Sequence, residues 1–316
     1  MVLTYYTLAT PLGGLPEYRY WQLETGLKTF RMHNPGRPAW LFVYDAVHDC
    51  VRDICHDHAI ELKAMGPYED ALRHVHPGWW ALRRHPVLQR WLALCHIPDE
   101  VERVLHLDND TIFFDSLDDL LSCHQQARVY ARKEASSRHH PKASDPLLID
   151  EDRLAALAQR LGGRFVPPFN TGVVLFNHGS WRAVRDQVER VIDLTWLCFL
   201  RFALSNESYK GICQQVVGPI RERLTTMSAA ERQRALPDYP TANVWIVEEV
   251  AMWLLLGELG LSCDQLRPDL VLQAREFERH EPDTADFTLI HYFSTNTEAV
   301  SRWLRRQPQA DAIMGA

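Results

Sequence analysis

Short apolar runs alternate with a segment of helical periodicity in the N-terminal part of the chain. Leu3–Ala9 and Trp40–Tyr44 are dominated by β-branched and aromatic residues and end in polar residues, which is typical of strands, and Ile60–Leu62 predicts a third. Tyr18–His33 repeats its apolar residues at the spacing of one helix face and stops at Asn34–Gly36. Strand, helix and strand in this order predict a parallel sheet with crossover helices.

The same alternation continues along the chain and predicts an α/β protein, in which helices flank a mostly parallel sheet. The further strands that we expect are residues 104–107, 111–114, 128–131, 165–177 and 286–293. The further helices that we expect are residues 68–95, interrupted at Pro77–Gly78 and at Pro86, and residues 115–121, 150–161, 181–202, 244–259 and 297–306.

Nothing in the sequence divides the chain into independent units. There is no internal repeat and no linker rich enough in Gly, Pro or Ser to mark a boundary, so we expect residues 1–316 to form a single domain. Residues 133–164 begin with a basic segment rich in serine and histidine, and we expect them to form a mobile lid. Residues 205–241 have the weakest periodicity, and we expect them to form a helical insertion that decorates the core.

The composition, 46% hydrophobic and 24% charged residues in a chain of 316, is that of an ordinary soluble globular protein with a sizeable core. A net charge of -7 and a pI near 6.1 argue against a nucleic-acid-binding protein, which usually carries a basic surplus. A phosphate-bearing ligand must then be bound locally, by a metal ion, helix N-termini or a few basic side chains. Arg83, Arg84 and Arg90 are candidates, although each could equally lie on a solvated helix face.

Seven scattered cysteines, with no Cys-x-x-Cys pair, are typical of reduced thiols and favour a cytoplasmic protein. Residues 55–58, Cys-His-Asp-His, lack the spacing and the distant second pair of a zinc site, so we expect a polar loop. The N-terminus has no basic segment followed by a long apolar core, so we expect no signal peptide. Val191–Leu204 and Val250–Leu261 are too short and too charged to span a bilayer, which predicts buried helices and no transmembrane segment.

Two carboxylates, Asp108 and Asp110, stand between the predicted strands 104–107 and 111–114. In an extended chain, side chains two residues apart point the same way, so both carboxylates can face one point. Like charges held this close need a cation between them, or one must be protonated. Carboxylates bind Mg²⁺ and Mn²⁺, which commonly link a protein to substrate phosphates, and open α/β sheets bind ligands at the carboxyl ends of strands. The alternative is an ordinary turn.

Three later segments carry side chains that could complete such a site. His291 ends an apolar strand, where its imidazole could bind the same metal or simply form a hydrogen bond. Asn170-Thr171-Gly172 is a polar turn whose amide and hydroxyl could bind sugar hydroxyls and whose glycine permits close backbone approach; turn chemistry alone would also explain it. Glu248 and Glu249 open a helix, where the dipole favours acidic residues, yet one of them could face a reacting carbon.

Taken together and in order, these segments resemble the GT-A glycosyltransferases of family 8, the group that includes glycogenin and bacterial lipopolysaccharide galactosyltransferases. Arg103–Thr111 is similar to the family's strand followed by Asp-x-Asp-Thr, and Ser116–Leu120 is similar to its acidic helix start. Phe169–Asn177 is similar to its Asn-Ser/Ala-Gly segment, and Ile290–Phe293 is similar to its C-terminal strand with the metal-binding histidine. The matches span roughly residues 3–303.

The resemblance implies a GT-A fold, a Rossmann-like mixed and mostly parallel sheet flanked by helices. It implies a retaining hexosyltransferase that uses Mn²⁺ or Mg²⁺ to move a sugar from a nucleotide-sugar, usually UDP-linked, to an acceptor that the sequence does not identify. The metal ligands that it implies are Asp108, Asp110 and His291. The catalytic residues that it implies are Glu248, with Glu249 as second choice, and Asn170. The donor-binding residues that it implies are Thr7, Ala9, Thr10, Asp45, Arg90, Asp108, Asn109, Thr171 and Gly172.

Two positions depart from the family pattern. The family usually follows its histidine with a Gly and a Lys that hold the diphosphate, whereas this chain has Ser294-Thr295-Asn296, and Thr10-Pro11 stands where members often carry an acid. Two other functions therefore stay open at this point. One is a non-catalytic nucleotide-sugar or carbohydrate binding protein on the same fold. The other is a metal-dependent phosphohydrolase or nucleotidyltransferase, because those enzymes also use paired carboxylates.

Overall fold

The computed structural model places most of the chain. The residues that it describes are 2–10, 14–75, 82, 88–134, 149–205, 222, 225–230, 239–241, 246–273, 276–277, 281–282, 285–292, 296–308 and 310–314. Several sequence predictions fall on other residues: Arg83 and Arg84, residues 135–148 of the expected lid, and most of the insertion expected at 205–241 lie outside the described residues.

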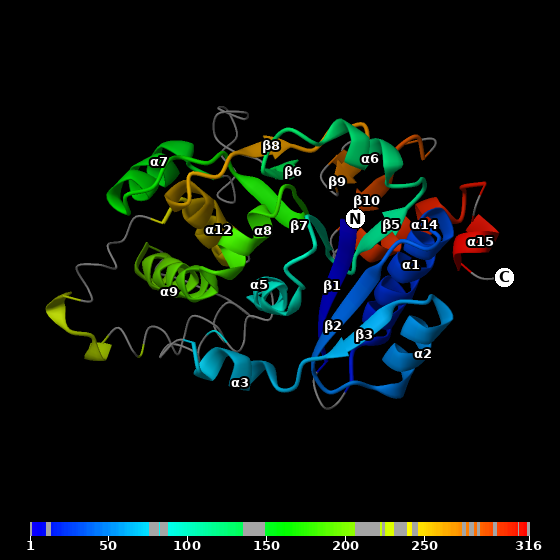
Figure 1. Ribbon diagram of the computed structural model, residues 1–316, viewed down its shortest axis with the longest axis horizontal. Helices are drawn as coiled ribbons and strands as arrows, with labels where there is room; N and C mark the ends of the chain where they lie inside the picture. The colour runs from blue at the N-terminus through cyan, green and yellow to red at the C-terminus, as the bar shows by residue number, and fades with distance from the viewer. Residues whose placement is uncertain are drawn as a thin grey trace.

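A seven-stranded sheet, in the order β3-β2-β1-β4-β7-β6-β8, organises the fold (Figure 1). The pairs β3–β2, β2–β1, β1–β4 and β6–β8 are parallel, whereas β7 runs antiparallel to both β4 and β6. The predicted mixed, mostly parallel sheet is therefore confirmed. Its strands are β1 (Val2–Thr10), β2 (Ala39–Asp45), β3 (Glu61–Ala64), β4 (Arg103–Leu107), β6 (Val129–Lys133), β7 (Phe169–Phe176) and β8 (Cys263–Gln265).

A second sheet of three strands lies beside the first, in the order β5-β10-β9. Its strands are β5 (Thr111–Phe113), β9 (Val271–Gln273) and β10 (Leu289–His291). β10 pairs antiparallel with β5 and parallel with β9. The pattern of apolar residues did not predict β8 or β9, because three residues with a mixture of polar and apolar side chains carry too little periodicity.

Alternating side chains of the large sheet face two separate layers of helices. Leu3 and Tyr5 of β1 pack into one apolar cluster, and Tyr6 and Leu8 pack into the other. This is the period of two that a strand imposes when both of its faces are covered. The apolar runs that predicted strands are thus continuous, because neither face of the central strands meets water.

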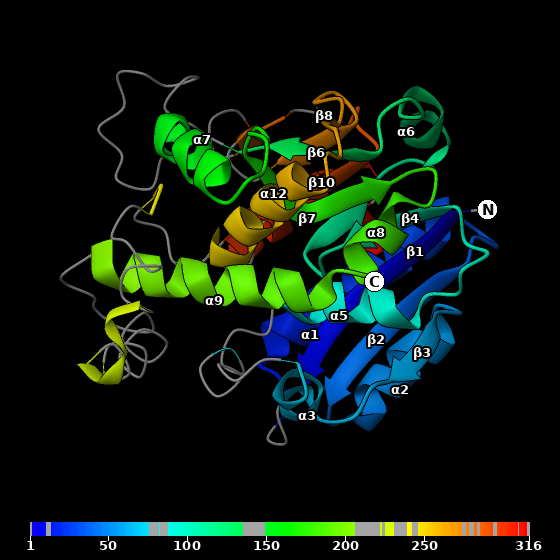
Figure 2. The ribbon, with the colours of Figure 1, turned by 60° about the vertical axis from the view of Figure 1, so that its left-hand side comes forward.

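Different sets of helices cover the two faces of the large sheet. The face that Figure 2 shows is covered by α5, α8, α9 and α12, and the other face is covered by α1 and α2. The bounds of these six helices are α1 (Glu17–His33), α2 (Asp49–Asp57), α5 (Gln89–Leu92), α8 (Ser180–Arg185), α9 (Val188–Ser205) and α12 (Val247–Glu258). The other helical segments are α3 (Tyr68–Arg73), η2 (Ala93–His96), α6 (Asp118–Cys123), α7 (Glu151–Arg160), α14 (Thr297–Leu304) and α15 (Ala310–Met314).

A third apolar cluster fills the space between the small sheet and the helices α14 and α15. Phe114 lies next to β5, Ile290 belongs to β10, and the ring of Trp303 of α14 packs against the rings of Phe114 and Phe287, which also contact each other. Trp303 is 1% exposed, and its indole Nε1–H donates to the carbonyl of Pro282. This packing ties β10, which carries His291, to the C-terminal helices.

Two sequence predictions were wrong in detail. Residues 181–202 do not form one helix, because the chain tightens at Asp186 and Gln187 and α9 restarts at Val188. Residues 55–58 are not a polar loop, since Cys55 to Asp57 form the last turn of α2. The side chain of Cys55 is buried, while His56 and Asp57 are exposed, so the amphipathic helix places them on opposite faces.

The helices α9 and α12 carry the longest apolar runs of the sequence, and both are packed in the core as predicted. Searched over its described parts, the chain contains no helix with the length and apolar character needed to cross a bilayer.

Candidate active site

The Asp-x-Asp segment follows directly from the carboxyl end of β4, near the middle of the large sheet. Asp108, Asn109 and Asp110 form a turn between β4 and β5, which the Thr111 hydroxyl closes by donating to the Asp108 carbonyl at 2.9 Å. Gly26 of α1 lies against this turn. A Cβ at Gly26 would stand 2.9 Å from the Thr111 carbonyl oxygen and 3.2 Å from that of Asn109, so the helix approaches the turn this closely only with glycine.

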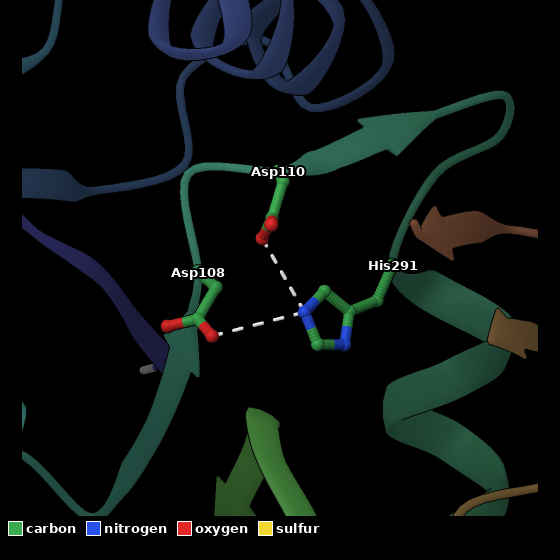
Figure 3. Close-up of side chains that lie close together, drawn as sticks. All are labelled: Asp108, Asp110 and His291. Atoms are coloured by element: carbon green, nitrogen blue, oxygen red, sulfur yellow. Dashed lines mark ion pairs between the residues drawn. The ribbon is translucent and has the colours of Figure 1, made fainter. Parts of the chain in front are cut away.

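His291 reaches the two carboxylates from the last residue of β10. It pairs with Thr111 across the small sheet, and the next residue, Tyr292, donates its backbone N–H to the Asp110 carbonyl at 3.1 Å. His291 Nε2 lies 3.3 Å from Asp110 Oδ1 and 3.7 Å from Asp108 Oδ2 (Figure 3). One ligand atom of each of the three residues lies within 4.8 Å of the others, and we call this group the Asp–Asp–His cluster.

Gly172 of β7 forms the floor beneath the His291 ring. A Cβ at Gly172 would stand 2.1 Å from His291 Cε1 and 2.5 Å from Nε2. The same residue accepts a hydrogen bond at its carbonyl from the backbone N–H of Asp108 at 2.8 Å. Gly172 therefore lets β7 lie close to both His291 and Asp108, and this close approach explains why the position is a glycine.

The Asp–Asp–His cluster has the chemistry of a divalent metal site. Donor atoms held at right angles around an ion such as Mg²⁺ are about 3 Å apart, close to the 3.3 and 3.7 Å separations from His291. Two carboxylates and an imidazole suit Mg²⁺ and Mn²⁺ better than thiophilic metals. Burial alone would lower the pKa of His291, but its hydrogen bond to Asp110 and the charge of Asp108 raise it, so the site favours positive charge.

Arg90 links the cluster to the acidic residues of α12. Its side chain is buried, with NH2 3.2 Å from Asp108 Oδ1 and NH1 3.7 Å from Glu248 Oε1. NH1 also donates to the Thr171 hydroxyl at 2.5 Å. Desolvation alone would raise the pKa of Asp108, but the Arg90 guanidinium and His106 outweigh it and hold that pKa well below its ordinary value. The site therefore favours the ionised form of Asp108.

Glu248 and Glu249 are both buried, which is not how acids that only cap a helix are placed. The Thr171 hydroxyl lies 3.2 Å from Glu248 Oε1 and 3.1 Å from Glu249 Oε1. Glu249 Oε1 also accepts from the backbone N–H of Thr171 and from Asn170 Nδ2, each at 3.2 Å. Burial, with Glu134 and Glu248 close by, raises the pKa of Glu249 well above its ordinary value. The two neighbouring acids therefore have different environments.

The remaining predicted residues lie toward the carboxyl ends of β1 and β2 and in the turn after β4. Asn109 Nδ2 donates to the Thr7 carbonyl at 2.8 Å, which ties β1 to the Asp-x-Asp turn. Ala9 and Thr10 follow on β1, and Thr10 pairs with Asp45 at the end of β2. Asp45 has a left-handed backbone with φ of 67°, and its carboxylate accepts from the backbone N–H of Tyr68 at 2.9 Å. These five positions lie outside the Asp–Asp–His cluster.

Sequence reasoning did not single out three residues that the structure places in or beside the site. His106 contacts Asp108, Glu134 accepts a hydrogen bond from Asn170 at 3.1 Å, and the Tyr5 hydroxyl donates to the Arg90 carbonyl at 3.0 Å. One signal was available for His106, because it stands two residues before Asp108 on the same strand and so shares its face. No local signal pointed to Glu134 or Tyr5.

Comparison with solved structures bears on the fold. WbbM, a bifunctional glycosyltransferase, superposes with a TM-score of 0.51 at 10% sequence identity, over 99% of this chain and 51% of WbbM. The chain has the GT-A fold. It spans about half of the length of WbbM.

Two further structures are similar over nearly their whole length. The galactosyltransferase LgtC, solved with donor and acceptor sugar analogs, has a TM-score of 0.48 at 11% identity over 96% of this chain and 95% of LgtC. Mouse xyloside xylosyltransferase 1 has a TM-score of 0.47 at 10% identity over 93% of this chain and 99% of its own. No protein-family model and no curated protein sequence matches the chain.

Proposed function

We propose that this protein is a metal-dependent glycosyltransferase that moves a sugar from a nucleotide-sugar donor to an acceptor hydroxyl. The observation that carries the proposal is the Asp–Asp–His cluster at the carboxyl end of β4 in a GT-A fold. Carboxylates and an imidazole converge there from separate strands, and open α/β sheets bind their ligands at this edge. The similarity of the fold to that of WbbM, a bifunctional glycosyltransferase, supports sugar transfer as the class of reaction.

Asp108, Asp110 and His291 would hold Mn²⁺ or Mg²⁺. Such an ion acts as a Lewis acid and stabilises the charge that develops on a departing nucleoside diphosphate, which we take to be UDP. Arg90 is the buried cation of the site and supplements the ion, because its guanidinium lies beside Asp108. This placement offers a source of positive charge in a chain that has Ser294-Thr295-Asn296 where the family keeps its Lys.

Protein side chains on the side of the cluster that faces α12 would bind and orient the donor sugar. Asn170 and Thr171 offer an amide and a hydroxyl there, and Thr7, Ala9, Thr10, Asp45 and Asn109 border the position proposed for the nucleoside. Glu248 is the acid that we assign to the reacting carbon. Its Oε1 lies 3.7 Å from Arg90 NH1 and 3.2 Å from the Thr171 hydroxyl, so it is directed toward the centre of the site. An acid held in this way supports a retaining reaction.

The proposal is tested with the purified protein, Mn²⁺ and a panel of UDP- and GDP-sugars, with free nucleotide measured over time. We expect Mn²⁺-dependent release of UDP from one or a few donors, its loss on addition of EDTA, and its loss in Asp110→Asn. Asp119→Asn makes the same chemical change at an exposed position of α6 and is expected to keep the activity.

Other outcomes would point elsewhere. Binding of a nucleotide-sugar and Mn²⁺ without any turnover, across acceptor mixtures, would favour the non-catalytic binding protein. Release of inorganic phosphate in place of the intact nucleoside diphosphate would favour a phosphohydrolase, since paired carboxylates also serve two-metal phosphoryl chemistry.

A further inference from the structure

His106 is a fully buried histidine next to the Asp–Asp–His cluster, and the proposed reaction assigns it no role. It lies on β4 two residues before Asp108, and its ring contacts two aromatic side chains. The ring centroid lies 4.9 Å from that of Tyr5 and 6.3 Å from that of Trp91. Packing against these two rings restricts the His106 side chain, and its Nε2 faces Asp108.

The two oxygens of the Asp108 carboxylate have different surroundings. His106 Nε2 lies 3.2 Å from Oδ1. Arg90 NH2 lies 3.2 Å from Oδ1 and 3.4 Å from Oδ2, so the arginine does not distinguish between them. The Oδ2 atom is the one that faces His291 Nε2, at 3.7 Å (Figure 3). His106 therefore binds the oxygen that points away from His291.

The surroundings of the two ring nitrogens indicate which atom donates in the hydrogen bond between His106 and Asp108. His106 Nδ1 is buried and has no hydrogen-bond partner among the residues that the structure describes. Asp108 is an anion, and a carboxylate anion only accepts hydrogen bonds. The ring hydrogen therefore lies on Nε2, which is within hydrogen-bond distance of the accepting oxygen Asp108 Oδ1 at 3.2 Å.

We propose that His106 is a positioning residue for the metal site: its Nε2–H fixes Asp108 Oδ1, and so turns Oδ2 toward the ion that Asp110 and His291 share. The inference rests on the proposed metal site. It adds a residue that does not touch the ion and acts through a carboxylate that does. Hydrogen bonds that orient a ligand in this manner commonly contribute about 10- to 100-fold to metal affinity.

Direct Mn²⁺ binding tests this role without reliance on sugar transfer. The concentration of free Mn²⁺ is followed by its electron paramagnetic resonance signal as the protein is titrated. We expect His106→Leu, which keeps the bulk but has no donor, to raise the Mn²⁺ dissociation constant about 10- to 100-fold. His106→Gln can donate from its amide to the same oxygen, and we expect it to restore most of the affinity.

His124 provides the control, because it is another buried histidine and lies beside the start of β4, away from the Asp–Asp–His cluster. Its Nδ1 lies 2.6 Å from the Leu120 carbonyl, and its Nε2 accepts from the Arg267 backbone N–H at 3.0 Å. His124→Leu is expected to lower the melting temperature and to leave the Mn²⁺ affinity unchanged. Should His106→Leu not unfold as one sharp transition, it is replaced by His106→Phe, which keeps a ring beside Tyr5 and Trp91 and also has no donor.

Three results would overturn the inference. His106→Leu could bind Mn²⁺ as tightly as the parent, or His106→Gln could bind as weakly as His106→Leu; either result removes the positioning role and leaves the proposed metal site intact. A parent protein that binds no Mn²⁺, with or without UDP, would remove the metal site and this inference together.

Discussion

Gly172 is the position at which one added methyl group should disable the metal site. In Gly172→Ala the new Cβ would stand 2.1 Å from His291 Cε1, whereas ordinary contacts lie at 3.4–4 Å. The ring must therefore retreat by about 1.3 Å, the difference between 3.4 and 2.1 Å. Metal ligation tolerates errors of only about 0.2 Å in ligand distance, so His291 is lost as a ligand. We expect a rise in the Mn²⁺ dissociation constant of at least about 100-fold, or about 2.7 kcal/mol.

The same substitution also has a cost in folding, and a control must separate the two effects. Overpacking of this kind costs about 1–3 kcal/mol of unfolding free energy. Gly257→Ala is the matched control. Gly257 lies in the C-terminal half of α12, and a Cβ there would also stand 2.1 Å from a neighbouring atom, the Arg164 carbonyl oxygen. We expect both variants to be destabilised in urea unfolding, and only Gly172→Ala to lose Mn²⁺ affinity.

Mn²⁺ titration by electron paramagnetic resonance or calorimetry checks this prediction in protein that is shown to be folded. If Gly172→Ala binds Mn²⁺ with the parent's affinity, His291 is not a ligand and our account of the site is wrong. If both glycine variants lose affinity equally, the loss reflects general destabilisation and says nothing of the His291 ring.

Three further predictions concern the charges of the site. Asp110→Asn removes one ligand charge at little cost in stability, and calorimetry should show no Mn²⁺-dependent UDP binding; retained binding would contradict the ligand assignment. Arg90→Leu leaves Asp108 and Glu248 without their shared cation, and urea unfolding should show a loss of about 3–5 kcal/mol, where a loss below about 1 kcal/mol would show that the pairing is unimportant. Glu249 has a raised pKa in the folded protein, so between its ordinary value of 4.5 and that raised value the folded state holds the extra proton and stability falls as pH rises. Glu249→Gln should remove this contribution, so that its stability relative to the parent increases from pH 5 to pH 8 by at most about 1.4 kcal/mol per pH unit; an identical pH dependence of both proteins would refute it.

Much of the fold follows from local patterns. The runs that form β1, β2 and β4 are apolar on both faces, because both faces of the central strands are covered by helices. The helix α7 was predictable to within a residue, since Asp150 caps it by accepting from the backbone N–H groups of Asp152 and Arg153. Short segments were not predictable: three residues of β8 carry almost no periodicity, and the interruption between α8 and α9 changes neither the apolar pattern nor the composition.

The sequence by itself predicted that Asp108 and Asp110 lie together at the end of a strand, because they stand two residues apart; the extended geometry expected for them was wrong, since both lie in the turn after β4. It did not determine that His291 would face them across the small sheet, since a residue far along the chain is placed by the pairing of β10 with β5 and by the packing of Trp303. It also did not separate Glu248 from Glu249. Hydrogen bonds from β7 decided their environments, and such contacts exist only after the chain has folded.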